Sequence, residues 1–267
     1  MPELPEVENV RRKLENKLKG KKIIDVDILY KNIILNDIDE FKKIINQTIK
    51  CINRRGKWLI FELDDYYMIS HLRMEGKYYF KTLDDAYDKH THVVFKFDDN
   101  SLLFYNDTRK FGRMKLINKE NLEKEINVGL EPFDEKLNIS YLKNKYIKKR
   151  KPIKTVLLDQ TIIAGIGNIY ADEILFLSHI NPHKLACDLH DEELSSLIIN
   201  TKQVLNKAIQ NGGTTIRSYE SLGTHGNFQE QLCVHTKAGS KCPKCQNIIE
   251  KTYINGRGTY YCSNCQK

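Results

Sequence analysis

The feature that most constrains this chain is a set of paired cysteines in its last 26 residues. They follow the pattern C-x2-C-x16-C-x2-C: Cys242, Cys245, Cys262 and Cys265. Each close pair can bind a metal from one tight turn, and four thiolates suit tetrahedral zinc. All four ligands come from protein, so we predict one structural Zn²⁺ with no position for a catalytic water. Two disulfides are the alternative, but the scattered Cys51, Cys187 and Cys233 favour reduced thiols in a reducing compartment.

The charge balance favours an anionic partner. The 267 residues include 43 Lys and Arg against 35 Asp and Glu, a net charge of +8. A basic but unspecialised surface is the alternative. The sequence contains no run of 18 apolar residues, and its first twenty residues are too charged for a secretory signal. We therefore expect a soluble cytoplasmic protein with no membrane partner.

The order of sequence patterns predicts an α+β protein. An amphipathic helix is expected over residues 5–19, where apolar residues recur at helical spacing. Short β-type runs from about 23 to 117, among them KWLIFEL, YYMISHL, VVFKF, SLLFY and RMKLI, predict an antiparallel sandwich or barrel. Helical patterns follow, the clearest over residues 193–213. We place domains at 1–130, 131–232 and 233–267.

The segment between the cysteine pairs predicts a β-hairpin with a cation at its tip. Two β-type runs flank Asn255, Gly256, Arg257 and Gly258. A tip arginine is ordinarily only solvated. Here the metal would make the module rigid and the glycines would let the backbone approach a partner, so an anion-binding role becomes plausible.

A second glycine-rich turn predicts a phosphate site. In GIGNIYADE, Gly165 and Gly167 precede Asn168, a good helix N-cap, and helix N-termini bind phosphate. Basic residues that include Lys149 and Lys154 lie just upstream. An ordinary glycine turn and a solvated charged face are the alternatives.

The N-terminal half offers residues for unstacking bases. HLRMEG sets Met74 in a turn, and DTRKFGRM sets Arg109 and Phe111 two apart, so that on an extended segment they would point the same way. Such apolar residues usually belong to the core, but beside a cation in a turn they can also wedge into a base stack. His90 and His92 share one side of a predicted strand and lack a third metal ligand, which favours a hydrogen-bonding or phosphate role.

The first residues allow two interpretations. In MPELPEVE, Pro5 and the acidic residues suit the first turn of a helix. Removal of Met1 would also turn the nitrogen of Pro2 into a secondary amine, which is a nucleophile.

Taken together and in this order, the motifs resemble the bacterial formamidopyrimidine-DNA glycosylases. The resemblance covers essentially the whole chain, from MPELPEVE through KWLIFEL, HLRMEG, DTRKFGRM, IKTVLLD, GIGNIYADE and NGGTTIR to the cysteine hairpin. It implies a β-sandwich with a flanking helix, a helix-two-turn-helix domain and a zinc hairpin. It also implies a monomeric base-excision repair enzyme, cytoplasmic and nucleoid-associated in a bacterium, that acts on double-stranded DNA containing oxidised bases.

The resemblance assigns roles to individual residues. Pro2 would attack C1′ of the damaged nucleoside, Glu3 would donate a proton, and Lys57 and Arg257 would serve β- and δ-elimination. The implied DNA contacts are Met74, His90, Arg109, Phe111, Lys149, Lys154 and Asn168. The segment from Thr214 to Gly226 would cover the extruded base.

Two alternative functions stand beside these assignments, and the sequence differs from the family's pattern at one place. Leu4 stands where the endonuclease VIII branch typically has Gly, which favours oxidised purines over oxidised pyrimidines. A non-catalytic zinc-hairpin protein that binds damaged DNA is the alternative from another class. His235, Thr236 and Lys237 stand where the family commonly shows an aromatic, a glycine and a basic residue, so the packing near the hairpin is expected to differ.

Overall fold

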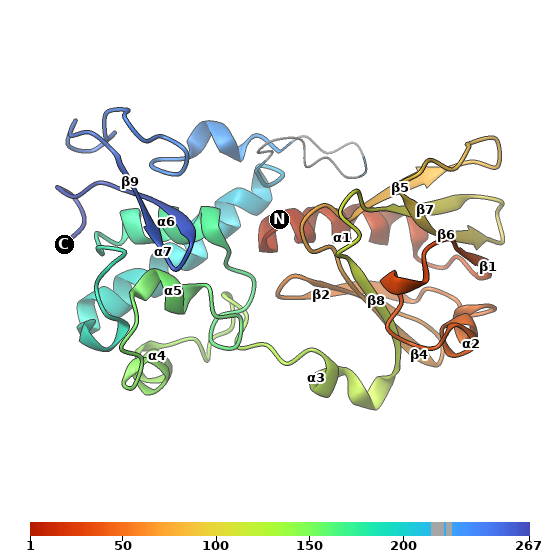
Figure 1. Cartoon of the computed structure of the whole chain (residues 1–267). Coiled ribbons are helices and arrows are strands. Elements are labelled where there is room, and N and C mark those ends of the chain that lie inside the picture. The colour runs from red at the N-terminus through yellow and green to blue at the C-terminus, as the bar shows by residue number, and fades with distance from the viewer. Residues whose placement is uncertain (215–221, 223–225) are drawn as a thin grey trace. The chain divides into compact units, whose positions relative to one another are not determined.

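The structure is a computed structural model that describes residues 1–214, 222 and 226–267. It divides into two compact units (Figure 1). Unit 1 comprises Met1–Asn127 and Gly212–Gly226, and unit 2 comprises Val128–Asn211 and Asn227–Lys267.

Unit 1 contains two four-stranded antiparallel sheets, one in the order β1-β6-β7-β5 and the other in the order β2-β3-β4-β8. The first consists of β1 (Ile23–Ile28), β5 (Lys77–Lys81), β6 (Thr91–Phe97) and β7 (Leu102–Asn106). The second consists of β2 (Cys51–Arg55), β3 (Trp58–Glu62), β4 (Tyr66–His71) and β8 (Arg113–Asn118). Apolar side chains from both sheets, including Phe61 and Phe95, share one buried core. The predicted sandwich is confirmed.

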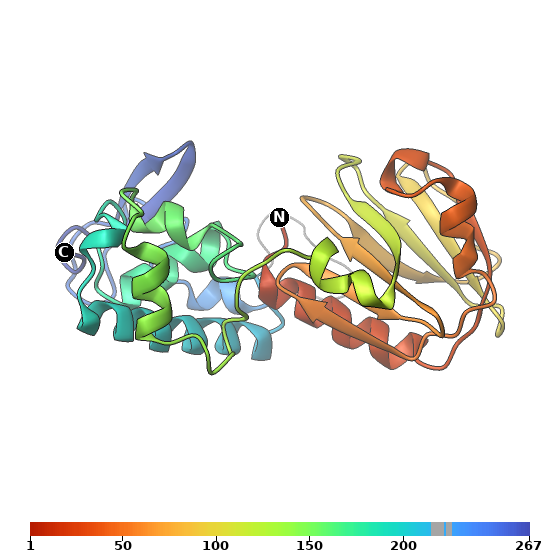
Figure 2. The same cartoon turned by 90° about the horizontal axis from the view of Figure 1, so that it is seen from below.

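The first helix, α1 (Leu4–Leu18), forms where its apolar spacing predicts it. Val7, Val10 and Leu14 are buried, because residues three and four apart share one helix face. The helix packs along β2 and β3 (Figure 2). The smaller helical segments of unit 1 are η1 (Lys31–Ile33), α2 (Ile38–Phe41), η2 (Lys42–Ile44), η3 (Lys119–Asn121) and α3 (Leu122–Glu125).

Unit 2 is mainly helical. Its elements are α4 (Ile139–Tyr146), α5 (Ile153–Leu157), α6 (Asn168–Leu177), η4 (Ala186–Asp188), α7 (Asp191–Gln210), η5 (Phe228–Gln231), β9 (Glu250–Ile254) and β10 (Arg257–Tyr261). The apolar stripe of α7 is buried as expected, and α7 packs against α6. In the part of the chain that the structure describes, no helix is long and apolar enough to cross a bilayer.

Two local predictions were wrong in detail. Asn168 is the first residue of α6, and Gly167 is its N-cap. The hairpin forms, but its tip is Asn255-Gly256, both at positive φ, and Arg257 begins β10 opposite Ile254. A two-residue turn with both residues at positive φ matches the right-handed twist of the strands, which explains why Asn-Gly occupies it.

Candidate active site and metal centre

The N-terminus is closely packed. Pro2 is buried, and Glu3, the N-cap of α1, is 3% exposed. The carboxylate of Glu6 accepts the Glu3 amide at 2.8 Å and, through its other oxygen, the Thr214 amide at 2.8 Å. Gly213 has φ +81°, and a Cβ there would lie 2.8 Å from the Glu6 carboxylate. Glu6 therefore links Glu3, which follows the predicted nucleophile Pro2, to Thr214. Thr214 is the first residue of the loop predicted to cover the lesion, and most of that loop lies outside the described residues.

Lys57 lies in the turn between β2 and β3 and is 5% exposed. A titratable neighbour that the sequence interpretation missed is His71, whose ring meets Trp58 edge-on with centroids 4.8 Å apart. Burial, with the charges of Arg73 and Lys57, lowers the pKa of His71 to about 3, so its ring is neutral and accepts the Arg73 amide at 3.0 Å. The residue begins the HLRMEG motif, where only the methionine had been considered.

Asp107 organises the loop that carries Arg109 and Phe111. Its buried carboxylate accepts the amides of Arg109, Phe111 and Gly112 at 2.9, 2.9 and 2.7 Å. The Arg109 guanidinium lies 4.8 Å from the centre of the Phe111 ring. The predicted pairing of the two side chains is present, and the missed signal was the Asp two residues before Arg109, a spacing at which Asp commonly accepts backbone amides.

Met74 and Phe111 line one groove of about 340 Å³, together with Met1, Arg73 and Arg113. Met74 is half-buried and Phe111 is 47% exposed. The structure thus brings together the apolar residues predicted to enter a base stack.

The two histidines of KHTHV have different surroundings. His90 is half-buried in the turn before β6, where its carbonyl accepts the Asp107 amide at 3.0 Å. His92 is buried, and its Nε2 lies 2.7 Å from the Asp107 carbonyl. His90 is therefore tied to the loop that carries Arg109, and His92 has a hydrogen-bonding role inside the fold.

In unit 2, three predicted residues meet at the hairpin backbone. The Gly258 carbonyl accepts both Lys154 Nζ and Asn168 Nδ2 at 2.9 Å, and Gly258 directly follows the exposed Arg257. Lys154 also donates to Thr259 Oγ1 at 2.9 Å. The start of β10 is thus held from α5 and α6.

Lys154 is 0% exposed, which differs from the expectation of a DNA contact. Its ammonium forms an ion pair with Asp172 at 2.6 Å, and the other oxygen of Asp172 lies 2.7 Å from His235 Nδ1. The His235 ring also meets Tyr260 edge-on with centroids 5.0 Å apart. The histidine therefore packs where the family's aromatic residue was expected, while Thr236 takes φ 66° where a glycine was expected.

Lys149 lies after α4 with 40% of its side chain exposed, and its Nζ is 3.4 Å from Asp159. The glycine turn before α6 is organised by Gln160, which donates to the carbonyls of Leu158 and Ile166 and accepts the Gly165 amide. The sequence interpretation missed Gln160.

The four paired cysteines form the metal centre. Their sulfur atoms all lie within 4.8 Å of one another. The Sγ separations are 3.8 Å for Cys242–Cys265 and 3.5 Å for Cys245–Cys262, close to the edge of about 3.8 Å that zinc–sulfur bonds give a tetrahedron. These separations are too long for disulfides. The residues fit one zinc ion with four thiolate ligands.

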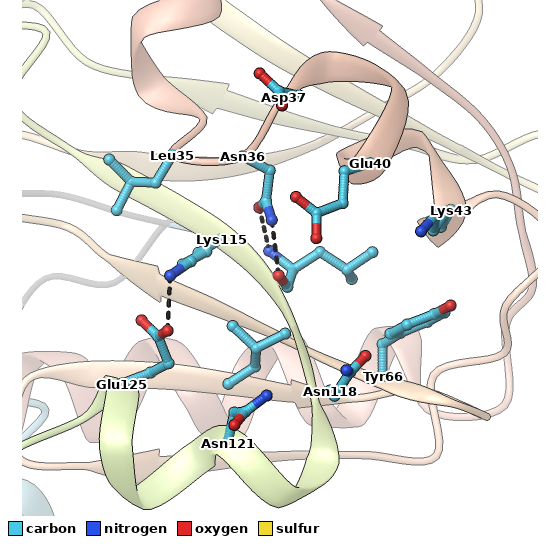
Figure 3. A pocket seen from close by; sticks show the side chains of 12 residues that line it. Leu35, Asn36, Asp37, Glu40, Lys43, Tyr66, Lys115, Asn118, Asn121 and Glu125 are labelled. Atoms are coloured by element: carbon cyan, nitrogen blue, oxygen red, sulfur yellow. Dashed lines mark hydrogen bonds and ion pairs between the residues drawn. The ribbon is translucent and has the colours of Figure 1, made fainter.

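A larger polar pocket of about 440 Å³ lies elsewhere in unit 1 (Figure 3). Asn36 binds both backbone groups of Leu116 there, and Lys115 pairs with Glu125 at 2.7 Å. No residue predicted for catalysis or DNA binding lines this pocket.

Comparison with known proteins identifies the family. Models of the formamidopyrimidine-DNA glycosylase N-terminal domain, the formamidopyrimidine-DNA glycosylase H2TH domain and a zinc finger found in FPG and IleRS match residues 1–114, 128–220 and 239–267. The chain belongs to the formamidopyrimidine-DNA glycosylase family. The resemblance noted from the motifs and the predicted fold class are thereby confirmed.

Relatives within the formamidopyrimidine-DNA glycosylase family are similar over their full length. The enzyme of Bacillus cereus is 46% identical over 100% of this chain and 99% of its own, and that of Lactococcus lactis is 45% identical over 100% of both. A crystal structure of a Lactococcus lactis FPG variant with Fapy-dG containing DNA matches with a TM-score of 0.95 and 43% identity over 100% of both chains. The structure of Lactococcus lactis Fpg with abasic-site DNA matches with a TM-score of 0.94 and 43% identity over 99% of both.

Proposed function

We propose that this protein is a base-excision repair enzyme that removes oxidised purines, 8-oxoguanine and formamidopyrimidines, from DNA and then nicks the abasic site. The observation that supports this most is the full-length match, at 43% identity, to an enzyme crystallised with Fapy-dG containing DNA. We infer that it works as a monomer on double-stranded DNA in the bacterial cytoplasm, near the nucleoid.

In the proposed reaction, Met1 is first removed and Pro2 gains a free secondary amine. The nitrogen forms a bond to C1′ of the damaged nucleoside while the bond from C1′ to the base breaks, and Glu3 supplies the proton needed for sugar opening and base departure. The resulting iminium makes the C2′ proton acidic. Loss of that proton expels the 3′ phosphate by β-elimination, and a second proton loss expels the 5′ phosphate by δ-elimination.

The other predicted residues take part in these steps or bind the DNA. Lys57 supports β-elimination, and Arg257 supports δ-elimination and phosphate binding, consistent with its exposed place at the start of β10. Met74, Arg109 and Phe111 fill the space left when the damaged base is extruded, which offsets an unstacking cost of about a few kcal/mol. The phosphate contacts come from His90, Lys149 and Asn168.

We propose a different role for Lys154. Because it is fully buried, it acts on DNA only through the hairpin backbone that it holds. Zinc supplies rigidity to the same hairpin when it is bound by the four cysteines.

Borohydride reduction tests the mechanism. Met-free protein mixed with a duplex containing 8-oxoguanine should yield a covalent complex on reduction, and peptide mapping should place the DNA on Pro2. The Pro2→Gly and Glu3→Gln variants should bind the duplex without cleaving it. A Met-free protein that cleaves the duplex without any trapped species would exclude the Schiff-base route.

A second substrate tests the lesion class. Excision of 8-oxoguanine should exceed excision of thymine glycol under the same conditions. A reversed ranking would indicate an oxidised-pyrimidine glycosylase, and binding without excision of either would indicate a non-catalytic damaged-DNA binder.

A further inference from the structure

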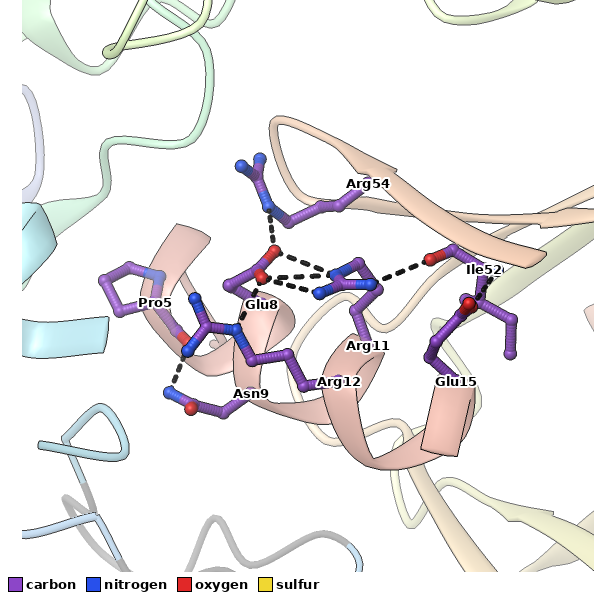
Figure 4. Close-up of polar contacts among 8 residues, drawn as sticks. All are labelled: Pro5, Glu8, Asn9, Arg11, Arg12, Glu15, Ile52 and Arg54. Carbon is purple, nitrogen blue, oxygen red and sulfur yellow. Dashed lines mark hydrogen bonds and ion pairs between the residues drawn. The ribbon is translucent and has the colours of Figure 1, made fainter. Parts of the chain in front are cut away.

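The polar face of α1 holds the edge strand of a sheet. β2 is the outer strand of the order β2-β3-β4-β8, so among the described residues one edge of its backbone has no strand beside it. At Ile52 these groups bind α1: the amide donates to Glu15, and the carbonyl accepts Arg11 Nη1 at 3.0 Å. The hairpin that carries Lys57 is therefore attached to the helix that begins just after Pro2 and Glu3 (Figure 4).

Glu8 is the centre of this attachment. Its carboxylate lies 3.0 Å from Arg11, 2.8 Å from Arg12 and 3.2 Å from Arg54 of β2. The side chains of Glu8 and Arg54 are only 12% and 10% exposed, whereas Arg12 is 54% exposed. Burial by itself would raise the pKa of Glu8, but hydrogen bonds from Arg11 and Arg12 and the charge of Arg54 outweigh it and lower that pKa. Glu8 is therefore an anion at neutral pH.

Arg54 extends the attachment to the turn itself. While its Nε pairs with Glu8, its Nη1 donates to the Gly56 carbonyl at 2.9 Å. That carbonyl belongs to the peptide bond that joins Gly56 to Lys57. The neighbouring Arg55 pairs instead with Glu123, at 2.6 Å. A planar guanidinium that binds two acceptors at once fixes both the distance between the two acceptors and their relative orientation.

We propose that Glu8 and Arg54 form a positioning pair that sets the place of the Lys57 ammonium relative to the α1 N-terminus. The inference rests on the proposed function, because it assigns the pair to the step that Lys57 serves. Neither side chain needs to touch DNA. The pair acts through the Gly56–Lys57 peptide, and a shift of about 1 Å in a catalytic group can cost roughly 100-fold in rate.

The test compares Arg54→Met with Arg12→Met. Both variants remove an arginine from the same carboxylate, but the hydrogen bond to the Gly56 carbonyl comes from Arg54. The assay is single-turnover cleavage of a duplex with a preformed abasic site, run beside borohydride trapping and well below the melting temperature of each variant. Arg54→Met should slow cleavage roughly 10- to 100-fold while trapping is retained, and Arg12→Met should match the wild type.

A double-mutant cycle separates positioning from general damage. If Arg54 acts only through Lys57, adding Arg54→Met to Lys57→Met should slow cleavage no further than Lys57→Met alone. Arg54→Lys, which keeps the charge but not the fork of donors, should fall between the wild type and Arg54→Met, and it replaces Arg54→Met if that variant does not fold.

The outcomes are distinct. Equal rates for Arg54→Met and Arg12→Met, or multiplicative losses in the double variant, would overturn the positioning role. Failure of Met-free wild type to be trapped or to cleave would instead overturn the proposed function.

Discussion

The turn that carries Lys57 and the hairpin that carries Arg257 are held by charges in very different surroundings. In unit 1 the holding pair, Glu8 and Arg54, keeps about a tenth of each side chain in water. In unit 2 the pair of Lys154 and Asp172 is fully buried. Removing one partner of a fully buried pair leaves a costly unpaired charge, whereas Glu8 keeps Arg11 and Arg12 as partners when Arg54 is removed. We therefore expect the Glu8–Arg54 pair mainly to affect the position of Lys57, and the Lys154–Asp172 pair mainly to affect stability.

Removing the metal should have the largest effect on stability, and that effect should be limited to unit 2. Structural zinc sites contribute about 10–16 kcal/mol of apparent binding free energy. A strong chelator should therefore unfold the hairpin, seen as protease cleavage between Cys242 and Cys265. Trp58, the only tryptophan, lies in unit 1, and its fluorescence should stay unchanged. A parallel loss of Trp58 fluorescence would contradict the expectation that unit 1 stays folded without the metal.

Breaking the buried pair of Lys154 and Asp172 should have the second-largest effect on stability. Asp172→Ala leaves the Lys154 ammonium buried with a lost partner and should destabilise unit 2 by about 3–5 kcal/mol. Thermal unfolding followed by circular dichroism would measure it. The matched control is Lys154→Met with Asp172→Leu, which removes both charges and should recover much of the loss; a double variant as unstable as Asp172→Ala would show that packing, not charge, dominates.

Acid should weaken unit 1 through His71. Its pKa is lowered from 6.5 to about 3 in the folded state, so between these values the unfolded chain binds more protons. Stability therefore falls as pH is lowered through this window, by up to about 1.4 kcal/mol per pH unit. Urea unfolding followed by Trp58 fluorescence should show this slope, and His71→Gln should flatten it. An unchanged slope in the variant would assign the acid sensitivity to other groups.

Relief of backbone strain should give the smallest effect. Thr236 is β-branched and has φ 66°, a conformation that costs such a residue about 1–2 kcal/mol. Thr236→Gly should stabilise unit 2 by roughly 0.5–1 kcal/mol after the greater flexibility of unfolded glycine is subtracted. Thr236→Ala keeps a Cβ and should gain less, so equal melting temperatures for the two variants would exclude strain as the cause.

Much of the fold was predictable because its signals are local. The apolar spacing of α1, the alternating β-type runs and the Asn255-Gly256 turn each depend on residues close in sequence. The spacing of the cysteines likewise predicted a metal centre that the sulfur positions fit. The roles of Pro2, Glu3, Lys57 and Arg257 in catalysis stay predictions.

Some supporting residues were missed although their partners are close in sequence, and others have partners that are distant in sequence. Asp107 and Gln160 were missed because backbone amides and carbonyls of nearby loops, not a motif, give them their function. Lys154 was expected at a DNA surface because it belongs to a cluster of basic residues and because the family resemblance implies a DNA contact there. Only the packing of α5 against α6 and the hairpin brings Asp172 and Gly258 to its ammonium.

The class of fold, the metal ligands and the family could thus be predicted from the sequence, because they depend on residue type and spacing. The tertiary structure alone decided which charges are buried and which groups they hold. Burial and hydrogen-bond geometry arise from segments as far apart as Glu8 and Arg54, or Asp172 and His235. No local pattern encodes such a contact, because each partner taken alone has the composition of an ordinary solvated charge.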